Sequence, residues 1–115
     1  MIKIITFVAV LFLFSCSNHK KLEDTTGVPL CLQNKIKTMA ANPSEGVPQS
    51  VTRYNYKGKT VYYMVAHCCD KFNIVFDSRC NILGYPDGGY TGRGDGKMTD
   101  FHQEVTDGKV VWKMK

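Results

Sequence analysis

The chain has 115 residues, of which 15 are lysine or arginine and 10 are aspartate or glutamate, so its formal net charge is +5. A hydrophobic share of 43% over this length is enough for one modest core, and therefore for a single domain. The charges of both signs are mixed along the chain and form no basic stripe, which argues against nucleic acid as a partner.

Residues 1–15 have the organisation of an export signal. Lys3 supplies a positive start, and an apolar run follows at residues 4–14, interrupted only by Thr6. A run of about 11 residues is too short to span a bilayer as a helix, which takes roughly 20. It is typical of a signal peptide. We therefore predict a signal peptide at 1–15, a lipidated polar tether at 16–28 and a single domain at 29–115.

The end of this signal resembles the lipobox of bacterial lipoproteins, in the sequence Leu13-Phe14-Ser15-Cys16. The resemblance implies that the chain is cleaved before Cys16, whose thiol carries a diacylglyceryl group and whose new amino terminus is acylated. Two or more acyl chains hold a soluble domain stably on a membrane. We expect a lipid anchor in the bacterial cell envelope, at the outer membrane, with the domain facing the periplasm or the exterior. The alternatives are plain secretion and a retained anchor helix.

The remaining chain predicts an α+β fold, with one N-terminal helix packed on an antiparallel sheet of about four to five strands. Pro29 suits the first turn of a helix that ends near Asn42, and apolar residues recur at spacings of three and four between them. Lys57-Gly58 signals a tight turn between two strand-like runs, and Asp107-Gly108 signals a second turn. A short helical turn is expected from Thr99 to Glu104. The predicted strands cover residues 51–57, 60–67, 72–77, 82–83 and 110–112.

Residues 84–100 are rich in glycine and aspartate and have no apolar period, so we predict a long loop there. Its ligand-binding candidates are Asp87, Arg93, Asp95 and Asp100. The three aspartates are also weak candidates for a calcium site, because Ca²⁺ takes six to eight oxygen ligands from a flexible chain. The spacing is not that of an EF-hand. The alternatives are a purely structural loop and a surface that binds protein or glycan.

Four cysteines besides Cys16 are disulfide candidates, since an exported protein meets an oxidising environment. Cys68 and Cys69 are adjacent, and a bond between them would close a strained ring, so each is expected to bind one of the other two. Two pairings satisfy this, with Cys31 bound to either member of the adjacent pair and Cys80 bound to the other. A soft metal site at His67 and these cysteines, or a thiol-redox role, is a weaker alternative.

Several short motifs together resemble a family of small bacterial lipoproteins built on an uncharacterised domain, over about residues 30–113. They are Val61-Tyr62-Tyr63, Cys68-Cys69-Asp70, Pro86-Asp87-Gly88-Gly89, the run at residues 91–97, Asp100-Phe101 and Val111-Trp112-Lys113. The resemblance implies location and fold and transfers no activity. We expect a non-enzymatic module that binds a protein or small ligand or supports the envelope, with no cofactor besides the lipid and with calcium as the alternative ligand.

Overall fold

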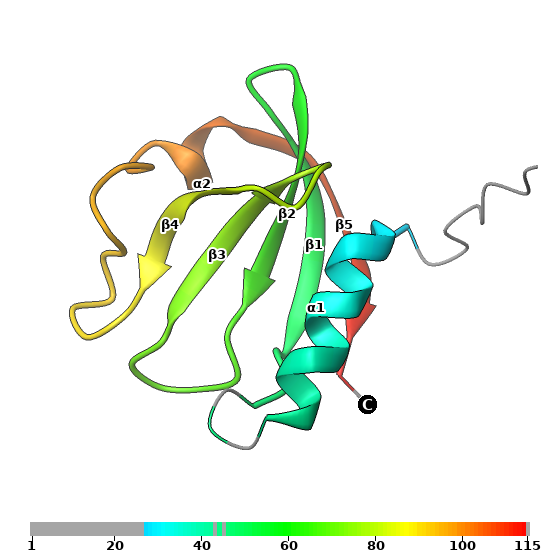
Figure 1. Cartoon of the computed structure of the whole chain (residues 1–115). Coiled ribbons are helices and arrows are strands. Elements are labelled where there is room, and N and C mark those ends of the chain that lie inside the picture. Colours follow the sequence, from blue (N-terminus) through cyan, green and yellow to red (C-terminus); the bar gives the residue numbers. More distant parts are fainter. Residues whose placement is uncertain (1–26, 43, 45, 115) are drawn as a thin grey trace, which may run out of the picture.

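The structure is a computed structural model that describes residues 27–42, 44 and 46–114. The predicted signal peptide and Cys16 lie outside these residues, as does nearly all of the predicted tether. One helix, α1 (Leu30–Ala41), packs across an antiparallel sheet of five strands in the order β4-β3-β2-β1-β5 (Figure 1). This confirms the predicted α+β class. The strands are β1 (Ser50–Tyr56), β2 (Lys59–Val65), β3 (Phe72–Asp77), β4 (Ile82–Gly88) and β5 (Val105–Lys113).

Local sequence signals explain where most elements begin and end. Pro29 precedes the first residue of α1, and Asn42 in extended conformation follows the last. Lys57 and Gly58 both take positive φ, 51° and 79°, as a two-residue hairpin turn requires, and β1 and β2 pair up to this turn. A short helix, α2 (Phe101–Glu104), lies within the predicted helical turn.

The sheet carries an apolar cluster on each face, because alternate residues of a strand point to opposite sides. On one face, Leu32 and Ile36 of α1 pack with residues of β1, β2 and β3, and the partly buried Trp112 of β5 packs against this cluster. On the other face, Met98 and Phe101 cover Val61 and Val75. The α1-side cluster is Val28, Leu32, Ile36, Val51, Tyr62, Met64 and Phe76.

Two predictions about irregular segments were wrong. Residues 84–88 are not loop but part of β4, whose glycine and proline fit because this is an edge strand of the sheet. Asp107 and Gly108 are not a turn but an irregularity inside β5. The pairing of β5 with β1 shifts register between Arg53 and Asn55, and Asp107 takes a φ of 56° there. The turn-forming residues Asp107 and Gly108 therefore mark a bulge within β5, and the strand continues beyond them.

The predicted disulfide pairings were also wrong. Cys31 binds Cys80, and Cys68 binds Cys69. Strand β2 ends at Val65, and the adjacent cysteines lie in the turn that follows it. Cys80 lies in the turn after β3, at the other end of a strand of 6 residues, which is about 20 Å long. Cys80 is thus close to the first turn of α1, while Cys68 and Cys69 are far from it.

Candidate functional site

A single helix cannot cover a five-strand sheet. An α-helix with its side chains is about 10 Å wide, whereas adjacent strands are about 4.8 Å apart, so one helix covers roughly two strands. In Figure 1, α1 lies toward the β1 and β5 side of the sheet; its cluster includes Phe76 of β3, but the Phe72 end of β3 and most of β4 are left uncovered on this face. Phe72 is consequently 42% exposed and Ile82 47% exposed.

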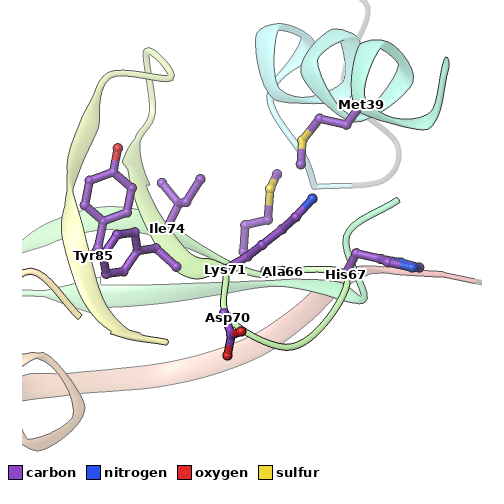
Figure 2. A pocket seen from close by; sticks show the side chains of 9 residues that line it. Met39, Ala66, His67, Asp70, Lys71, Ile74 and Tyr85 are labelled. Atoms are coloured by element: carbon purple, nitrogen blue, oxygen red, sulfur yellow. The ribbon is translucent and has the colours of Figure 1, made fainter. Parts of the chain in front are cut away.

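An apolar groove occupies this open area beside the C-terminal end of α1. Its volume is about 320 Å³, at the lower end of the range for small-molecule sites. Figure 2 shows Met39 reaching down from α1 on one side and Tyr85 standing opposite it, with Ile74 between them. The Phe72 and Tyr85 rings pack together at 5.1 Å between centroids. We call this the β3–β4 groove. Its lining residues are Met39, Met64, Ala66, His67, Asp70, Lys71, Phe72, Ile74 and Tyr85.

Three polar residues of the β3–β4 groove, His67, Asp70 and Lys71, come from the connection between β2 and β3. Nδ1 of His67 lies 3.0 Å from the carbonyl oxygen of Val47, and Nζ of Lys71 donates to the carbonyl oxygen of Ser44 at 2.8 Å. These two bonds tie the β2–β3 connection to the segment that follows α1. The Asp70 carboxylate points away from Met39 and Ile74 (Figure 2). The groove is therefore lined mainly by apolar side chains, together with Lys71, whose ammonium donates to the carbonyl oxygen of Ser44.

The first of the sequence candidates, Asp87, lies on the opposite face of the sheet, where it joins three strands to α2. Its carboxylate accepts hydrogen bonds from the Tyr63 hydroxyl at 2.8 Å and from Nδ2 of Asn73 at 2.7 Å. Nε2 of His102 also donates to it. Burial, and then the bond to Asp87, raise the pKa of the Tyr63 phenol well above its usual value. The Asp87 cluster therefore holds α2 against β2, β3 and β4.

The other candidates do not join Asp87. Asp100 accepts from the Tyr56 hydroxyl at 2.7 Å and pairs with Lys57 at 2.5 Å, and the bonds from Lys57 and then Tyr56 lower the pKa of its carboxyl. Asp95 accepts from the backbone N–H of Lys97, and Arg93 is exposed at the surface. Within residues 27–42, 44 and 46–114, no group of three or more His, Cys, Asp or Glu residues is placed to hold a metal. The calcium hypothesis stays a prediction.

A family model for a domain of unknown function, DUF6970, matches residues 37–114. The chain belongs to the DUF6970 family. The matched region contains the whole sheet and every residue that lines the β3–β4 groove, and it begins after Cys31. No curated protein and no solved structure gives a match.

Sequence reasoning missed the β3–β4 groove of this DUF6970 domain. The signal that could have found it is the mismatch between one short helix and the number of predicted strands. Phe72, Ile74 and Phe76 share one face of β3 by alternation, yet α1 buries only the last of them fully. In the part of the chain that is described, no helix is long and apolar enough to cross a membrane.

We predict that Asp87→Asn destabilises the domain by about 1–3 kcal/mol. The amide keeps one acceptor oxygen but turns an N–H₂ group toward donors, so at least one of Tyr63, Asn73 and His102 loses its partner. The free energy of unfolding from urea titration measures the loss. Asp95→Asn is the matched control, because an asparagine oxygen can still accept from the N–H of Lys97. An equal loss in both variants would contradict a structural role for the Asp87 cluster.

Proposed function

We propose that this DUF6970 chain is a lipid-anchored protein of the bacterial cell envelope whose domain binds a small amphipathic molecule in the β3–β4 groove. The molecule has an apolar body and an anionic head. The observation that carries the proposal is the composition of the groove, whose lining combines apolar side chains with a lysine.

The lipobox-like sequence at Cys16 supports the anchor. A diacylglyceryl group with a third acyl chain would fix the protein to a membrane, since two or more chains are needed for stable attachment. The residues between Cys16 and the first described residue, Gly27, would act as a spacer. The domain would then work next to a membrane, where amphipathic molecules are concentrated.

The chemistry of the groove supports the ligand class. Met39, Met64 and Ile74 offer flexible and aliphatic surface, and thioether side chains adapt to irregular apolar shapes. Burial of an apolar chain against them would supply most of the binding free energy, at about 25 cal/mol per Å² of surface removed from water. The Lys71 ammonium in the lining would favour a carboxylate or another anion over a neutral or cationic head.

The anchor is tested with Cys16→Ser in the full chain. We expect the unchanged chain to fractionate with membranes and to carry acyl groups by intact-mass analysis, and the variant to lose both. A variant that still fractionates with membranes, together with a native chain without added acyl mass, would overturn the anchor.

The groove is tested with dodecanoate and with 1-anilinonaphthalene-8-sulfonate, an aromatic anion that fluoresces in apolar sites. We expect the dye to bind, dodecanoate to displace it, and Ala66→Trp to abolish binding by filling the groove. Ser78→Trp, in a polar hollow between β2 and the β3–β4 turn, is the matched control and should bind as the unchanged chain does. Lys71→Glu should weaken the binding of dodecanoate but not the binding of dodecanol. Binding that survives Ala66→Trp, or no displacement by dodecanoate, would overturn the proposal.

A further inference from the structure

The two disulfides of this domain differ in what they connect. Cys31–Cys80 joins residues separated by 49 positions and fixes α1 to the β3–β4 turn, where Cys80 packs against the α1-side core. Cys68–Cys69 joins neighbours, with a sequence separation of 1. A disulfide stabilises a fold mainly by restricting the unfolded chain, and the effect grows with the loop that it closes. No residue lies between Cys68 and Cys69, so their bond closes no loop of intervening chain and contributes little to the stability of the fold.

The position of the Cys68–Cys69 bond makes it accessible to a reacting partner. Both cysteines are exposed in the connection between β2 and β3. They line a second hollow of about 170 Å³, together with Gln49, Asn73 and other residues. Exposure of both cysteines and a space beside them for an attacking group give a reductant access to the bond.

We propose that Cys68 and Cys69 form an exchangeable disulfide–dithiol site that is reduced by a dithiol reductant. One thiolate of the reductant attacks a sulfur of the pair, the Cys68–Cys69 bond breaks, and the other cysteine leaves as a thiolate that takes up a proton. The second thiol of the reductant then attacks the mixed disulfide and releases the first cysteine. Two electrons pass to the protein, and the reductant ends as a disulfide. Reduction leaves two adjacent thiols able to chelate one thiophilic centre.

The test treats the folded full chain with rising dithiothreitol, blocks free thiols with iodoacetamide and maps them by peptide mass spectrometry. Trypsin separates the sites, because residues 60–71 form one peptide with Cys68 and Cys69, while Cys16, Cys31 and Cys80 fall in others. We expect the 60–71 peptide to be alkylated at both cysteines roughly tenfold faster than the peptides of Cys31 and Cys80, since exchange rates follow access. A 60–71 peptide that reacts only after urea unfolds the chain, or Cys31–Cys80 reduced first, would overturn the proposal.

A second measurement identifies the product as a dithiol. Phenylarsine oxide should add to the reduced chain with loss of one water, because arsenic bridges two sulfurs, and the adduct should map to residues 60–71. Cys69→Ser keeps one thiol and should give no adduct that withstands excess monothiol. An adduct of equal persistence on that variant would contradict a paired site. Neither measurement needs a ligand in the β3–β4 groove, so the result is independent of the proposed function.

Discussion

Gly94→Ala is expected to lower the free energy of unfolding by about 3 kcal/mol or more, from overpacking together with a left-handed alanine. A Cβ on Gly94 would lie 1.9 Å from the carbonyl oxygen of Tyr85 and 2.8 Å from the backbone nitrogen of Asp87. Both atoms belong to the backbone of β4, so no side-chain rotation relieves the contact. The segment after β4 would have to move off the strand, and the backbone bonds that Gly94 and Asp95 donate to Gly88 and Tyr85 would break.

Gly92→Ala is the matched control for this prediction. Gly92 has a φ of 74°, close to the 66° of Gly94, but a Cβ there meets no atom within 4 Å. The control therefore carries the left-handed alanine alone and should lose about 1 kcal/mol. Urea titration followed by far-UV circular dichroism measures both variants. Equal losses of unfolding free energy in the two variants would mean that the contact between a Cβ at Gly94 and the backbone of β4 does not destabilise the domain.

Part of the fold could be predicted from the sequence, and the segment that contains these glycines could not. Alternation in residues 51–57 and 72–77 predicted two strands, and the structure confirms their positions to within a residue because turn residues bound each of them. The Gly- and Asp-rich segment was predicted as a single loop. Its first part pairs with β3 through backbone bonds, which need no apolar side chain and leave no hydrophobic period to read.

The candidate site was less predictable than the fold for a similar reason. Asp87, Asp95 and Asp100 were singled out by residue type, but their partners are set by tertiary packing. Asp87 meets Tyr63 and Asn73 only because β2, β3 and β4 are neighbours in the sheet. The position of a groove beside a helix depends on where the helix crosses the sheet, and no local sequence pattern predicts where that crossing lies.

Removal of the Cys31–Cys80 bond by the double replacement Cys31→Ser and Cys80→Ser is expected to cost about 4 kcal/mol. The estimate is the chain entropy that the unfolded state regains when a cross-link between residues separated by 49 positions is lost. For a domain of this size, that is a large share of a total stability of about 5–15 kcal/mol. The matched control is Cys68→Ser with Cys69→Ser, which should lose no more than about 1 kcal/mol, since that bond closes no loop.

Hydrogen exchange would locate the loss, because the bond fixes only one end of α1. In α1, Leu32 is fully buried and Ile36 nearly so, and the side chains of both pack on the sheet in the cluster that Cys80 also contacts. Without the bond, the amides of α1 should exchange well before those of β2 and β3, since the helix can lift away while the central strands stay paired on both sides. If the helix and the central strands instead lost protection together and by the same factor, α1 would not open separately from the sheet, and the bond would act only on the global unfolding of the domain.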